Sequence, residues 1–112
     1  MKLTAGADAP ERCVQGLTVA AVAASSGAPV SLWLTGESVR LARPDGELVL
    51  PESPPASELL EGVLALGTVT ACTQCLARRF LTEADLRPGV RVAGAAVFAA
   101  EVLADDAQAL VY

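Results

Sequence analysis

The sequence contains no histidine, and only 4% of its 112 residues are aromatic. The absence of histidine excludes every mechanism that needs an imidazole, including Ser-His-Asp triads, Cys-His nucleophile pairs and HExxH metal sites. Chemistry through thiols and carboxylates remains. Because aromatic side chains are so few, we expect a core of alanine, valine and leucine.

Positive charge is also scarce, since eight Lys and Arg residues face thirteen Asp and Glu residues, giving a formal net charge of -5. Such a chain lacks the dense cationic stripe that binds a nucleic-acid backbone. Its longest apolar stretch, residues 92–100, is far shorter than the roughly 18 residues that a membrane span requires. No apolar segment of the export-signal type follows Met1. The sequence therefore predicts a cytoplasmic protein with neither nucleic acid nor membrane as a partner.

The chain has an excess of apolar residues. Apolar residues make up 53% of it before glycine is counted, against roughly 45–50% for an average soluble chain with glycine included. This composition excludes disorder. A chain of 112 residues has the length of a single domain, and a surplus beyond what one small core hides commonly goes into contacts between subunits.

Short apolar runs alternate with helical patterns, which is typical of an α/β domain with a mainly parallel sheet flanked by helices. Asp8 and Glu11, with Pro10 between them, predict a capping-box start for the first helix, and Ser57 is the expected N-cap of the second. Helices are expected over residues 9–24, 57–67, 75–80 and 95–104, and strands over residues 2–5, 30–34, 68–72, 90–92 and 109–112.

The region from Glu37 to Ser57 is interrupted by four prolines. Residues 39–41 and 47–50 fit the two arms of a small hairpin, and residues 39–41 fit one turn of helix equally well. Further on, Thr82 and Asp85 have the spacing of a capping box and predict a brief helical turn.

Cys72 and Cys75 form a C-x-x-C motif at the junction between an expected strand and an expected helix. Unpaired backbone N–H groups at a helix start favour the thiolate, the reactive form of cysteine. The carboxyl ends of strands are also where clefts form in open α/β sheets. Cys75 lies one helical turn on and could act as a resolving thiol, and Arg78 and Arg79 add positive potential.

Other interpretations of the cysteines remain open. Two cysteines without histidine cannot complete a four-ligand zinc site in one chain, so no metal or other cofactor is expected, although a metal shared across a dimer is an alternative. Both cysteines could also serve only as small buried residues. Cys13, on a helix that packs on the sheet, is expected to be a core or interface side chain.

Several segments resemble the DsrE/DsrF-like family, which includes the Tus sulfur-relay subunits. Residues 68–79, TVTACTQCLARR, are similar to the strand, cysteine and following helix of that family. Residues 35–39 resemble its loop facing the cysteine, and residues 92–94 through 109–112 resemble its closing helix and strand. Phe80 departs from the pattern, because related helices often end in glycine at this point.

The resemblance implies one small domain over residues 1–112 with a mostly parallel sheet, assembled as homo-oligomeric trimers or hexamers. It implies that Cys72 holds sulfane sulfur as a persulfide, while Cys75 matches a second cysteine found in only some members. The residues expected to contact a substrate are Gly36 and Glu37 in the facing loop and Thr73 and Gln74 between the cysteines.

Three functions follow as hypotheses. The first is a sulfur-transfer protein in which Cys72 accepts sulfur from a donor protein and passes it to an acceptor, with Cys75 releasing the product by disulfide formation. The second is a dithiol redox protein that uses the C-x-x-C motif. The third is a non-catalytic oligomeric module that binds a small ligand near Gly36, Glu37 and Cys72. Glu37 fits either a base or an exposed residue at a helix start, and Trp33 is expected to pack on its strand or at an interface.

Overall fold

The computed structural model describes all 112 residues and contains a four-stranded sheet in which every pairing is parallel. The strands lie in the order β1 (Lys2–Leu3), β2 (Ser31–Leu34), β3 (Thr68–Cys72) and β4 (Arg91–Ala93). The helices are α1 (Pro10–Ser25), α2 (Ala56–Leu66), α3 (Thr73–Ala77) and α4 (Ala95–Val102), with short 3-10 helices η1 (Gly36–Ala42) and η2 (Glu83–Asp85). The expected α/β fold with a parallel sheet is confirmed.

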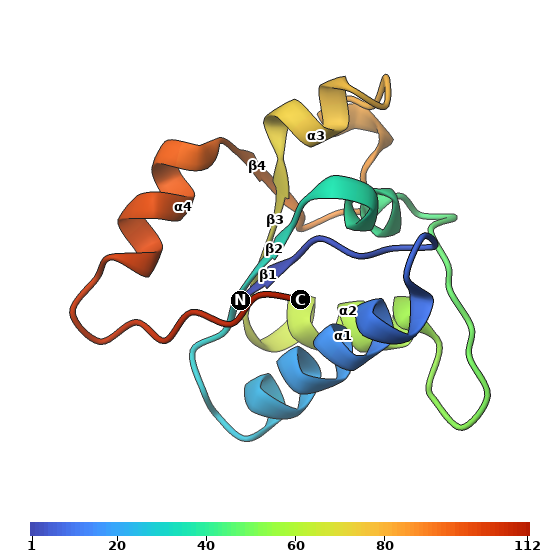
Figure 1. The fold of residues 1–112 in the computed structure, drawn as a ribbon, viewed down its shortest axis with the longest axis horizontal. Helices are drawn as coiled ribbons and strands as arrows, with labels where there is room; N and C mark the ends of the chain where they lie inside the picture. The colour runs from blue at the N-terminus through green and yellow to red at the C-terminus, as the bar shows by residue number, and fades with distance from the viewer.

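The helices cover opposite faces of the sheet, α1 and α2 on one face and α4 on the other (Figure 1). The chain steps from β1 to β3 in one direction, so right-handed crossovers place α1 and α2 on the same face. After β4 it returns through α4 to the far edge, where Val111 pairs in parallel with Lys2. A return in the opposite direction places α4 on the opposite face. In place of the strand expected over residues 109–112, the chain forms a bridge beside β1, held by backbone hydrogen bonds of Lys2 with Leu110 and Tyr112 and of Thr4 with Tyr112.

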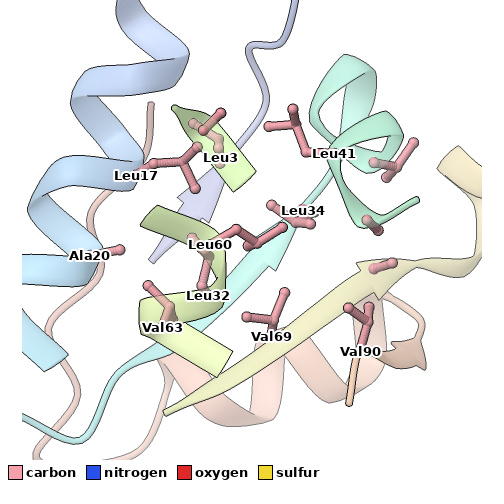
Figure 2. Close-up of a cluster of buried hydrophobic side chains, with 14 of the residues drawn as sticks. Leu3, Leu17, Ala20, Leu32, Leu34, Leu41, Leu60, Val63, Val69 and Val90 are labelled. Atoms are coloured by element: carbon pink, nitrogen blue, oxygen red, sulfur yellow. The ribbon is translucent and has the colours of Figure 1, made fainter. Parts of the chain in front are cut away.

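The face toward α1 and α2 holds the apolar core, as Figure 2 shows. Successive strand residues point to opposite faces, and here the alternate residues Leu32, Leu34, Val69 and Ala71 point into the core. The two helices pack onto them with residues at helical spacing, which are Cys13, Leu17, Ala20 and Ala24 of α1 and Ala56, Leu60 and Val63 of α2. As the composition predicts, the largest share of this core is leucine, valine and alanine.

The opposite face of the sheet combines one aromatic pair with a set of polar contacts. Trp33 is only 2% exposed, lies edge-on to Phe98 of α4 at 5.3 Å between ring centroids, and donates its indole N–H to Glu101 Oε2 at 2.8 Å. Ser31 and Arg91 donate to the same carboxylate at 2.7 and 3.2 Å. Helix α4 buries none of its residues fully. The packing role expected for Trp33 is therefore confirmed.

None of the helices is both long and apolar enough to cross a membrane.

Two of the expected helix caps are wrong. The Asp8 carboxylate accepts the N–H of Gly6 at 2.8 Å, and Ala9 occupies the N-cap of α1 without a side-chain cap. Ser57 lies inside α2, whose N-cap is Pro55, and its hydroxyl bonds Glu47 instead. The Asp8 carboxylate bonds within its own loop and the Ser57 hydroxyl bonds Glu47, so neither side chain caps its helix. Pro10 suits the first turn of α1, where its missing N–H leaves no donor unpaired.

The structure of residues 37–57 decides between the hairpin and the helical turn that the sequence left open. Residues 39–41 belong to η1, so the hairpin alternative is wrong, and residues 47–50 form no strand. Val39 and Leu41 are buried in the core, so the apolar residues of this stretch pack inward from a 3-10 helix. The helical turn expected at Thr82 is confirmed, since the Thr82 N–H donates to Asp85 Oδ2 at 2.7 Å.

Candidate functional site

The carboxyl ends of the parallel strands meet at one edge of the sheet and bring three loops together. The loop after β1 packs against the loop after β2 so closely that a Cβ at Gly6 would lie 2.9 Å from the backbone of Glu37. Gly36 has φ +55, and a Cβ there would lie 2.8 Å from the carbonyl oxygen of Thr4. Only glycine fits both the left-handed backbone and this space. The loop after β2 also contacts α3, because the Gly36 N–H donates to Cys75 Sγ at 3.2 Å.

Cys72 is the last residue of β3 and the N-cap of α3, and it is half-buried. The helix begins at Thr73, two residues earlier than expected, and ends at Ala77 rather than Phe80. Thr73 and Gln74 are therefore exposed residues of its first turn. The strand-to-helix junction predicted at the C-x-x-C motif is present, with Cys72 at its corner.

The surroundings of Cys72 favour its thiolate. Burial raises the pKa of this thiol, but hydrogen bonding from the backbone N–H and the thiol of Cys75 and from the N–H of Gln74 lowers it, and so does the charge of Lys2. The result is a pKa below the ordinary value of a cysteine. A partly exposed thiol with a lowered pKa is the kind that reacts with sulfur electrophiles at neutral pH.

Cys75 is buried and behaves in the opposite way. Its burial raises the pKa and the neighbouring Cys72 raises it further, which together outweigh the N–H of Gly36 and the charge of Arg79. That N–H donates to Cys75 Sγ at 3.2 Å. Cys75 therefore holds its proton more tightly than Cys72 does.

Glu37 is engaged by two arginines. Arg79 donates to Glu37 Oε1 through Nη2 at 2.6 Å and through Nε at 2.9 Å, and Arg40 donates to Oε2 at 3.0 Å. The hydrogen bonds from Arg79 and Arg40 lower the pKa of Glu37. Such a carboxylate is a weak base, so the geometry favours a structural role for Glu37 over proton transfer.

Arg79 also connects the two halves of the site, a role that the sequence alone did not indicate. Its Nη1 donates to the carbonyl oxygen of Cys75 at 3.0 Å, while its other nitrogens hold Glu37 in η1. The arginine thus fixes η1 against α3 and keeps the Gly36 N–H at the Cys75 sulfur. A usable signal was its spacing, since residue 79 lies one helical turn after Cys75. The neighbouring Arg78 is exposed and forms no ion pair.

The third cysteine lies away from this edge. Cys13 has no exposed surface and lies in the apolar core under α1, as expected. Burial, with a smaller contribution from Asp8, raises the pKa of Cys13 to about 11. No three His, Cys, Asp or Glu side chains lie close enough together to hold a metal ion.

Comparison with known families agrees with the geometry. The profile of the DsrE/DsrF-like family matches residues 3–109, nearly the whole chain. The protein therefore belongs to the DsrE/DsrF-like family, and this membership indicates a role related to sulfur relay. No curated protein matches the sequence.

Proposed function

We propose that this member of the DsrE/DsrF-like family carries sulfane sulfur as a persulfide on Cys72. The observation that supports the proposal is the position of that thiol at the end of β3, partly exposed and surrounded by groups that favour its thiolate. Sulfur transfer needs an accessible thiolate and little else from a protein. A reducing compartment such as the cytoplasm keeps such a thiol free.

Loading is a thiol exchange that needs no external oxidant. The Cys72 thiolate attacks the outer sulfur of a donor persulfide, a new S–S bond forms to Cys72 Sγ, and the donor leaves as a thiolate. Unloading is the same exchange in reverse direction, because an acceptor thiolate attacks the outer sulfur and Cys72 leaves as a thiolate. A donor or acceptor cysteine must reach Cys72 from the exposed side, past Thr73 and Gln74.

Cys75 gives the persulfide a second route. The Cys75 thiolate attacks Cys72 Sγ and the S–S bond of the persulfide breaks. Hydrosulfide leaves, and a disulfide joins the two cysteines. The sulfane sulfur is reduced and the dithiol is oxidised, so an external thiol must then reduce the disulfide. Because Cys75 holds its proton more tightly than an ordinary thiol, this route is slow, which favours transfer to an acceptor over loss of sulfide.

The test is the intact mass of the protein before and after treatment with glutathione persulfide. Wild type and the Cys75→Ser and Cys13→Ser variants are expected to gain one sulfur atom, and Cys72→Ser is expected to gain none. Addition of excess cysteine should return the loaded proteins to their starting mass. Equal loading of Cys72→Ser would contradict the proposal.

A dithiol redox function is the second candidate, and the contact between the two thiols of the motif favours it. Here the motif itself cycles between dithiol and disulfide. The same mass measurement separates the two functions, because a loss of two hydrogens that requires both Cys72 and Cys75 identifies disulfide formation. A measured reduction potential within the range of known dithiol oxidoreductases would then favour redox exchange.

A further inference from the structure

Phe80 has an unfavourable position within a single copy of the chain. It follows α3 in a turn closed by hydrogen bonds from Arg79 N to Leu76 O at 2.8 Å and from Leu81 N to Leu76 O at 3.1 Å. Phe80 has φ +56, and a left-handed residue after a helix closed in this way is usually glycine. A bulky side chain in that conformation is a backbone outlier.

The Phe80 side chain gains nothing in return from its own chain, because it is 95% exposed. Glycine at this position would remove both the backbone strain and the exposed aromatic ring. An outlier of this kind points to a role outside the element that contains it. The turn that contains Phe80 directly follows α3, and Figure 1 shows α3 on the opposite side of the view from α1.

A surface that fits an aromatic side chain lies elsewhere on the same chain. A hollow of about 440 Å³ opens between α1 and the loop over residues 50–53. Its hydrophobic lining comes from Val14, Val19, Leu50 and Tyr112, beside Pro51 and polar residues. The hydrophobic side chains offer a contact surface for a phenyl ring, and the volume is large enough to hold it.

Unpaired charges around the two features are complementary. Glu11 and Glu52 also line the hollow, and neither forms an ion pair within its own chain. Arg78, two residues before Phe80, is exposed and equally free of an ion pair. The positive charge of Arg78 beside Phe80 is thus complementary to the negative charges of Glu11 and Glu52 beside the hollow.

We propose that Phe80 of one copy inserts into the α1 hollow of a second copy, with Arg78 facing Glu11 and Glu52. The contact joins two different parts of the chain, so it is either exchanged reciprocally in a two-fold dimer or repeated head-to-tail around a ring or along a filament. The contact brings α3 of one copy against α1 of the next. It requires no sulfur chemistry and is independent of the persulfide proposal.

The test begins with sedimentation velocity of the purified full chain over a range of concentrations. Wild type is expected to associate, and Phe80→Gly is expected to weaken association about thirtyfold or more, as the loss of an interface anchor does. Because glycine relieves the left-handed backbone, Phe80→Gly should keep the wild-type melting temperature or exceed it. The control Leu103→Ala removes another side chain that is 80% exposed and should leave association unchanged.

A charge exchange then tests the receiving surface. Arg78→Glu is expected to weaken association, and the triple variant Arg78→Glu, Glu11→Lys, Glu52→Lys is expected to restore it. A monomeric wild type at every concentration, or association of Phe80→Gly equal to wild type, would overturn the proposal. Failure of the triple variant to restore association would overturn the α1 hollow as the receiving surface. Cys72 persulfide loading, measured on the same variants, reports separately on the proposed function.

Discussion

Cys13 and Cys72 show what two regions of one small fold do to the same side chain. Cys13 lies under α1, in the apolar layer against the sheet, where burial raises its pKa to about 11. Cys72 lies at the open edge of the same sheet, where a strand passes into a helix and backbone N–H groups lower its pKa. The difference comes from backbone position. A thiol in the interior of a layer serves packing, whereas a thiol at the end of a strand is available for chemistry.

The largest expected difference between the two regions is in reactivity. With iodoacetamide at pH 7, we expect Cys72 to react at least about a hundredfold faster than Cys13, because the thiolate fractions differ by that factor or more. Mass analysis of the peptides over time measures both rates in one sample. Similar rates for the two thiols would remove the distinction between the regions.

The second difference is in the pH dependence of stability. The folded pKa of Cys13 is raised to about 11 from an ordinary 9.0, so its contribution is fully present below pH 9 and is lost as the pH rises through 11. We expect that loss to be about 2–3 kcal/mol of unfolding free energy. Urea denaturation at pH 8 and at pH 11 measures it, with Cys13→Ala expected to lose that much less than wild type. Leu103→Ala, which removes an exposed side chain that does not titrate, serves as the control and should show the wild-type loss.

Substitution by serine should cost more stability at Cys13 than at Cys72, although Cys72 is the more reactive thiol. Cys13→Ser places a hydroxyl in the apolar core and should destabilise the fold by about 1–3 kcal/mol. Cys72→Ser changes a partly exposed side chain and should stay within about 0.5 kcal/mol of wild type. Urea denaturation at pH 7 measures both values. A larger loss for Cys72→Ser would mean that the strand-end cysteine is structural.

The smallest expected effect is that of Arg79 on the reactivity of Cys75 at the open edge of the sheet. Arg79→Gln removes the contacts to Glu37 and to the Cys75 carbonyl, and the Gly36 N–H then no longer stabilises the Cys75 thiolate. After Cys72 forms a mixed disulfide with Ellman's reagent, attack by Cys75 releases a second thionitrobenzoate. We expect Arg79→Gln to slow that second release about threefold.

Arg78→Gln is the matched control for this measurement. It removes the same charge one residue away, and Arg78 contacts neither Glu37 nor Cys75. Its second release should proceed at the wild-type rate. Equal slowing in both variants would mean that charge alone, and not the position of η1, governs Cys75.

The parts of this fold that follow from periodicity could be predicted from the sequence. Alternation predicts β2 and the short β-branched run predicts β3, so Cys72 is expected at a strand end. Cys13 is expected in the core or at an interface because it lies on a helix that packs on the sheet. The caps expected at Asp8 and Ser57 are wrong because each side chain has another partner, the Gly6 N–H in the same loop for Asp8 and Glu47 in the preceding loop for Ser57. The bond between Glu37 and Arg79 spans 42 residues, and no local pattern carries such a contact.

The most direct test of the central claim uses wild type with all three thiols present and a limiting amount of glutathione persulfide. Cleavage after arginine separates the peptide of Cys13 from the peptide that contains Cys72 and Cys75, and fragmentation then distinguishes the last two. We predict that the added sulfur is found on Cys72. Sulfur found first on Cys13, or shared equally among the three cysteines, would contradict the account.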